Sequence, residues 1–170
     1  MRSLFVTALA LTGLACQSAP RAQVSAGDAG AREQLFSAVK RLEGTWHNAD
    51  GHGPESSTTF ALTSGGSVVR ETMFPGTEHE MVNMYALDGD GLVMTHYCAG
   101  GNQPTMRATA LENNSLAFRF ESVRDLKAAD EVYMGEMTLT FLGDGTVEQH
   151  WNALRGHEVD HAITFKLTRR

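Results

Sequence analysis

The sequence predicts an all-β fold: an antiparallel β-barrel of about ten strands, preceded by one short α-helix. From Gly44 onward, short segments rich in Val, Thr, Phe and Tyr show an apolar–polar alternation, and turns rich in Gly, Asn or Asp separate them. Before Gly44, apolar residues instead recur at helical spacing. A long run of antiparallel strands leaves exposed sheet edges unless the sheet closes, so a barrel is the expected arrangement.

The predicted helix lies in the segment AREQLFSAVKRLEG. Leu35, Val39 and Leu42 recur at positions i, i+4 and i+7, which places them on one helical face. Asp28 is a candidate N-cap, and Gly44 is expected to end the segment. The chain should therefore begin its folded part with one amphipathic helix.

The candidate strands follow one another at the spacing of an all-β meander. The charged stretch 122–131 is expected to form a helical turn or a long loop. We expect strands near residues 44–49, 56–63, 67–73, 79–87, 92–98, 105–111, 115–121, 133–142, 146–154 and 159–167. These residues fit one barrel, and the 170-residue length also favours a single domain, over 31–170.

Residues 1–15 have the features of a signal peptide. Arg2 is followed by the apolar run LFVTALALTGLA, which is too short to span a membrane, and Ala15 suits a cleavage site. The next residue, Cys16, resembles the lipidated cysteine of a bacterial lipobox. Residues 16–30 are rich in Ala, Ser and Gly and are expected to form a flexible tether.

The expected localisation is therefore the cell envelope, as a periplasm-facing outer-membrane lipoprotein, with plain secretion as the alternative. Membrane contact is expected through lipidated Cys16 only. The whole chain has a formal net charge of −6, and no basic cluster is present. A nucleic-acid partner is not expected, because phosphates require clustered Lys and Arg.

The alternation in each strand assigns side chains to the barrel interior. In the last strand, Val159, His161 and Ile163 share a face with Phe165 and Leu167. For 79–87, the alternation leaves open whether the set containing Asn83 and Tyr85 or the opposite set points inward. The candidate ligand-binding residues of the interior are Met94, His96, Cys98, Met106, Phe118, Met137, Gln149, Trp151 and His161.

The motif HEVDH, residues 157–161, matches the H-E-x-x-H pattern of zinc peptidases, but the segment is expected to be a strand. Residues four apart on a strand are separated by about 13 Å, too far for two imidazoles to bind one zinc ion. His96 and Cys98 share a strand face, yet a buried histidine and a small buried thiol explain them. We therefore expect no metal site and assign no catalytic residue.

The run RLEGTWHNADGHG, at the junction of helix and barrel, resembles the calycin superfamily of lipocalins, fatty-acid-binding proteins and haem-binding nitrobindins. The stretch SGGSVVRETMFPGTEHEMVNMYALDGDGLVMTHYCAGGNQPTM is similar to uncharacterised exported bacterial proteins of this barrel class. The resemblance covers residues 35–167 and implies a barrel with an internal ligand site. Nitrobindins bind haem through a histidine near the chain end, and His161 has a comparable position.

Three functions are compatible with these observations. The first is a barrel that binds a small apolar or amphipathic molecule or a lipid in its interior. The second is a haem protein with isomerase or redox chemistry in which His161 binds the iron. The third is a structural or partner-binding envelope module with a filled core. Catalysis is less expected than binding, and the cofactor, if there is one, is not defined by the sequence.

Overall fold

The computed structural model describes residues 27–49 and 57–169. The predicted signal peptide, Cys16 and most of the predicted tether lie outside the described residues. The last two tether residues are helical, because helix α1 begins at Ala29. Within the described ranges, no helix is both long and apolar enough to cross a membrane.

Helix α1 (Ala29–Lys40) confirms the helix expected from the sequence. Asp28 is its N-cap, and its Oδ1 accepts a hydrogen bond of 2.8 Å from the Ala31 backbone N–H. Leu35, Val39 and Leu42 are buried against the barrel. The apolar stripe that predicted the helix is thus the face by which α1 packs.

In the described part of the chain eleven strands follow, and ten of them correspond to the ten expected strands with small shifts of their ends. The additional strand, β7, has two residues, and β8 extends into the segment that was expected to be a turn or loop. The strands are β1 (Gly44–Asn48), β2 (Ser57–Thr63), β3 (Val68–Met73), β4 (Met81–Asp88), β5 (Gly91–Tyr97), β6 (Gln103–Ala108), β7 (Leu111–Glu112), β8 (Ser115–Arg124), β9 (Val132–Phe141), β10 (Val147–Arg155) and β11 (Glu158–Thr168).

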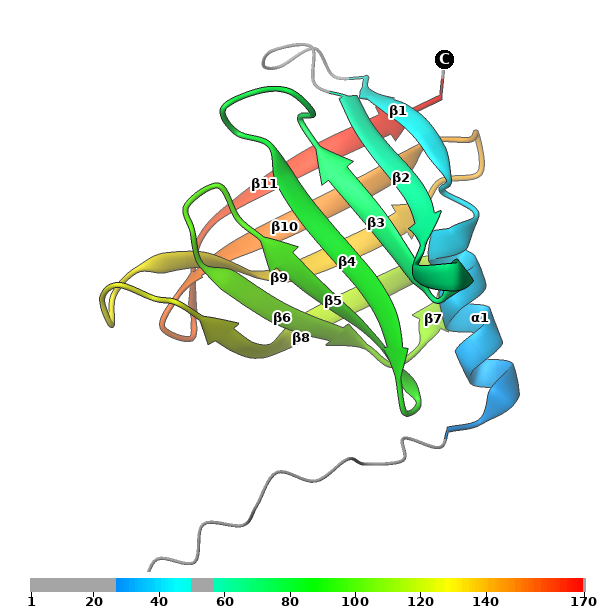
Figure 1. Ribbon diagram of the computed structural model, residues 1–170, viewed down its shortest axis with the longest axis horizontal. Helices are drawn as coiled ribbons and strands as arrows, with labels where there is room; N and C mark the ends of the chain where they lie inside the picture. Colours follow the sequence, from blue (N-terminus) through cyan, green and yellow to red (C-terminus); the bar gives the residue numbers. More distant parts are fainter. Residues whose placement is uncertain (1–26, 50–56, 170) are drawn as a thin grey trace, which may run out of the picture.

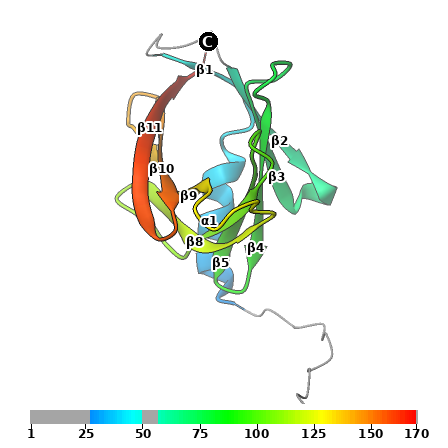
Figure 2. The same cartoon turned by 90° about the vertical axis from the view of Figure 1, so that its left-hand side faces the viewer.

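The strands form a closed antiparallel barrel of ten strands, with β7 as a short addition paired to β8. Most neighbours in the sheet are consecutive in sequence. Two pairings close the ring: β1 with β11, and β6 with β8. Figure 2 shows the resulting walls, with β2–β5 on one side and β9–β11 on the other.

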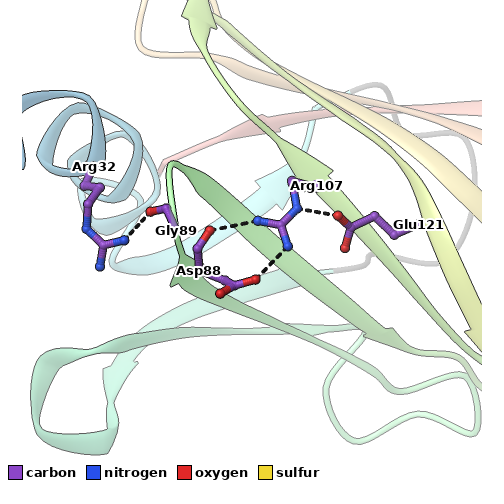
Figure 3. A network of polar contacts seen from close by, with 5 residues as sticks. All are labelled: Arg32, Asp88, Gly89, Arg107 and Glu121. Atoms are coloured by element: carbon purple, nitrogen blue, oxygen red, sulfur yellow. Dashed lines mark hydrogen bonds and ion pairs between the residues drawn. The ribbon is translucent and has the colours of Figure 1, made fainter. Parts of the chain in front are cut away.

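Helix α1 lies at one end of the barrel, next to β4, β5 and β7 (Figure 1). Polar contacts hold this end together, as Figure 3 shows. The Arg32 guanidinium donates to the Gly89 backbone carbonyl in the β4–β5 turn. Arg107 on β6 bridges the same turn and β8, because it pairs with both Asp88 and Glu121. The other end of the barrel carries the loops that follow β3, β5, β8 and β10.

Candidate functional site: a polar layer inside the barrel

A layer of polar side chains crosses the otherwise apolar interior of the barrel. Glu71 on β3, Asn83 on β4 and His96 on β5 are direct cross-strand partners in three neighbouring strands. Direct partners share one face of a sheet, and all three side chains are buried, so the row faces inward. Gln149 reaches the row from β10 in the opposite wall and is also buried.

The Glu71 carboxylate is the centre of this layer. Its Oε2 accepts hydrogen bonds from Asn83 Nδ2 at 2.7 Å and from the Tyr85 hydroxyl at 2.6 Å. Its Oε1 accepts from Gln149 Nε2 at 2.7 Å, a contact that connects residues 78 positions apart in the sequence. Three donors thus stabilise one buried carboxylate, which lies between two walls of the barrel.

The donors around Glu71 fix the direction of the remaining hydrogen bonds. Because Asn83 donates its amide N–H to Glu71, its Oδ1 is free to accept from His96 Nδ1, at 2.6 Å. His96 Nδ1 therefore bears the proton, and Nε2 of the neutral ring is an acceptor. Likewise, Gln149 donates to Glu71 and leaves its own Oε1 as an acceptor.

Burial shifts the pKa values of the titratable groups in the layer. Desolvation raises the pKa of the Glu71 carboxyl, although its hydrogen bonds from Tyr85, Gln149 and Asn83 oppose the shift. Desolvation lowers the pKa of His96 to about 4, so its imidazole is neutral at physiological pH. Burial, followed by the nearby charge of Glu71, raises the pKa of Tyr85, which keeps its hydroxyl proton.

Three atoms of this region are buried without a hydrogen-bond partner: His96 Nε2, Gln149 Oε1 and Trp151 Nε1. The side chains that carry these atoms are neighbours. The rings of His96 and Trp151 have their centroids 5.2 Å apart, and Gln149 and Trp151 are alternate inward residues of β10. Two of these atoms are acceptors, and the indole N–H is a donor. Buried polar atoms normally have partners, so this group of atoms marks a candidate binding site.

Apolar side chains surround the polar layer, as the alternation predicted. Tyr85 and Phe118 pack edge to face with ring centroids 5.7 Å apart. Apart from His96 and Gln149, the predicted interior residues that the structure buries are Met94, Met106, Phe118, Met137 and Trp151. The candidate site is therefore a small polar group within an apolar interior.

The predicted burial of His161 is wrong. Its side chain is 59% exposed and its Nδ1 contacts Asp160 Oδ2 at 2.9 Å. Its strand neighbours Val159 and Ile163 are also exposed, by 57% and 43%. The physical reason is that β1 pairs with β11 only near residues 167 and 168, so the first half of β11 has β10 as its sole described neighbour. The apolar–polar alternation identifies which side chains of a strand share the inward face. It does not indicate whether the rest of the barrel covers that face along the whole strand.

The other candidate side chains do not join the polar layer. Cys98 is half-buried and its Sγ accepts from the Gly100 backbone N–H at 3.4 Å, in the turn after β5. His79 lies in the exposed turn before β4, beside Glu78. In the described part of the chain, no group of three His, Cys, Asp or Glu side chains is placed to hold a metal ion. The segment of HEVDH from Glu158 is a strand, as expected.

Sequence reasoning missed the centre of the site. Glu71 was not singled out, although it shares a strand face with Val69 and Met73, both of which are buried. An acidic residue within the apolar set of a strand was the available signal. On β4, Asn83 and Tyr85 are buried, so the alternate set that contains them is the one that faces the barrel interior.

Comparisons with protein-family models and with curated proteins give no match to this chain. The structure itself establishes a closed ten-stranded antiparallel barrel with one N-terminal helix. The site must therefore be interpreted from its own geometry and chemistry.

Proposed function

We propose that this protein is an exported, lipid-anchored, calycin-like barrel that binds a small amphipathic molecule in its interior. The observation that carries the proposal is the group of three unpartnered polar atoms on His96, Gln149 and Trp151, buried inside a closed apolar barrel. The polar head of the ligand would bind these atoms. Its apolar body would contact the surrounding methionine and aromatic side chains.

The energetics of buried polar groups support a ligand at this position. An unpaired buried donor or acceptor costs about 1–3 kcal/mol, so three such atoms are a substantial penalty for the free protein. A ligand that pairs with them recovers this free energy on binding. Ordered water could also pair with them, and this would correspond to the structural-module alternative.

The exposed half of β11 offers a route into the interior. Ile163 is the cross-strand partner of Trp151, and Phe165 is the partner of Gln149, so both belong to the inward face. Ile163 is nevertheless 43% exposed, so the inward face of β11 is not fully covered at this position. An apolar molecule could therefore enter along β11 and reach Trp151 and Gln149.

The methionines of the interior favour an adaptable pocket. Met73, Met94, Met106 and Met137 are all buried around the polar layer. Methionine is unbranched and has three rotatable side-chain bonds, so it can repack around a ligand at low cost. This composition suits a binding barrel better than a rigid structural core.

The haem alternative rests on His161, which is exposed and contacts Asp160. No observation of the described structure favours iron binding by this side chain. The lipid anchor at Cys16 and the calycin relationship stay part of the proposal and rest on the sequence resemblance.

Native mass spectrometry of the exported chain, against a denatured sample of the same preparation, tests the proposed function. We expect an additional mass that is present in the native spectrum and absent after denaturation, because only folded chains form the interior site. Covalent lipid on Cys16 would persist in both spectra and serves as an internal control. A mass equal to haem would support the haem alternative instead.

The variants Trp151→Phe and Trp46→Phe locate the bound molecule. Trp46 Nε1 already donates to the Leu42 carbonyl at 2.7 Å, so its replacement should leave the additional mass in place. Trp151→Phe removes one of the unpartnered atoms and should reduce the bound fraction. A bare native mass for a chain exported by its own host would contradict a tightly retained ligand, and equal loss in both variants would contradict the assigned position.

A further inference from the structure

Glu71 is a fully buried carboxylate that no Lys or Arg side chain of the described residues compensates. The buried polar and charged residues that the structure describes are Thr58, Glu71, Asn83, His96, Asn102 and Gln149, and none is Lys or Arg. No ion pair to Glu71 is formed within residues 27–49 and 57–169. Buried charges in proteins are normally paired, so a cation bound next to Glu71 would compensate its negative charge.

The atoms left free around Glu71 are mostly acceptors. Its three donor partners leave one lone-pair site of the carboxylate, on Oε1. The two unpartnered acceptors of the layer are Gln149 Oε1, on a side chain that donates to Glu71, and His96 Nε2, on a side chain joined to Glu71 through Asn83. This arrangement is complementary to a head group that donates several hydrogen bonds and is positively charged.

Two further features favour a cation. Aromatic side chains adjoin the polar layer, because Trp151 packs on the His96 ring and Phe118 packs on Tyr85, and aromatic rings are favourable neighbours of bound cations. The formal net charge of the whole chain is −6, which attracts cationic molecules over longer distances. By contrast, a carboxylate head would meet two free acceptors and a like charge.

We propose that the ligand is an organic ammonium: an apolar body with a protonated amine that donates to His96 Nε2 and Gln149 Oε1 and neutralises Glu71. This inference rests on the proposed function and adds the charge of the ligand. A hydroxyl next to the ammonium would also accept from Trp151 Nε1, the remaining unpartnered donor.

Isothermal titration of the exported chain with n-octylammonium, n-octanol and octanoate tests this inference, because the three probes share one apolar body. We expect octylammonium to bind at one site per chain and about tenfold or more tighter than the other two, as for a charge-assisted hydrogen bond. Glu71→Gln should remove this preference. Glu112→Gln, which changes an exposed glutamate on β7, is the matched control and should preserve it.

The outcomes separate the inference from the proposed function. If octanol or octanoate binds at one interior site as tightly as octylammonium, the ligand is not selected by charge, and the proposed function stands. Binding of none of the probes, with no retained mass in the native spectrum, overturns both proposals. A preference that persists in Glu71→Gln overturns the role of Glu71. If that variant does not fold, the order of affinities in the unaltered chain still decides the inference.

Discussion

Lowering the pH from 6.5 to 4 is expected to reduce the free energy of unfolding by about 3 kcal/mol through His96. Burial lowers the pKa of His96 from 6.5 to about 4 in the folded protein. Within this window the unfolded chain takes up a proton at His96 and the folded chain does not. The stabilisation from His96 is therefore full above the unfolded pKa and is lost as the pH falls through the folded pKa.

Glu71 acts in the opposite direction, because burial raises its pKa in the folded state. Its contribution to the free energy of unfolding is fully present below the ordinary pKa of a glutamate. It is lost as the pH rises through the raised pKa of the folded state. The measurement is therefore the difference in urea unfolding between the unaltered chain and His96→Gln across this range, since Glu71 is common to both. Gln can still donate to Asn83 Oδ1.

His150→Gln is the matched control, because His150 is exposed on β10 and contacts Thr164 at 2.8 Å. It should leave the pH dependence of the unaltered chain in place. The same pH dependence in His96→Gln as in the unaltered chain would show that His96 is not the buried neutral base described here.

Replacement of Trp151 by Ala is expected to destabilise the fold by about 3–5 kcal/mol, as for other large-to-small changes in a core. Trp151 is 1% exposed, contacts the His96 ring, and lies in register with Met137 on β9. Its removal leaves a cavity at the centre of the barrel and exposes the polar layer to water. Chemical denaturation at neutral pH measures the change.

Trp151→Phe should be less destabilising than Trp151→Ala, because it removes fewer buried atoms and leaves a smaller cavity. The variant keeps an aromatic ring against His96 and deletes an N–H that has no partner in the free protein. A cost as large as that of Trp151→Ala would mean that the indole N–H is paired in the free protein, for example by ordered water.

The fold was predictable because alternation and turns are local signals. Each strand of the barrel carries its own apolar–polar pattern, and the helix carries its own N-cap at Asp28 and its own apolar stripe. The two-residue strand β7 was missed because so short a segment has no readable period. The bulge between Ala153 and Leu154 shifts the register of β10 against β11 and is not visible in the sequence either.

The site was only half predictable, because its chemistry depends on contacts between distant strands. Alternation correctly placed His96 and Gln149 inside, but nothing local connects Gln149 to Glu71. The exposure of His161 follows from the short pairing between β1 and β11, a property of barrel closure. Barrel closure and contacts across the barrel depend on the tertiary structure. The local periodicity therefore identified interior residues but not their hydrogen-bond partners.

The central claim, that the ligand binds at the polar layer beside Trp151, is tested most directly by NMR of the two indole N–H groups. The chain has two tryptophans. Trp46→Phe assigns the two resonances, and Trp46 serves as the reference because its N–H is paired with the Leu42 carbonyl. During titration with n-octylammonium, we expect the Trp151 resonance to shift with saturation while that of Trp46 stays unchanged. A saturable binding curve that leaves the Trp151 resonance in place would contradict the claim.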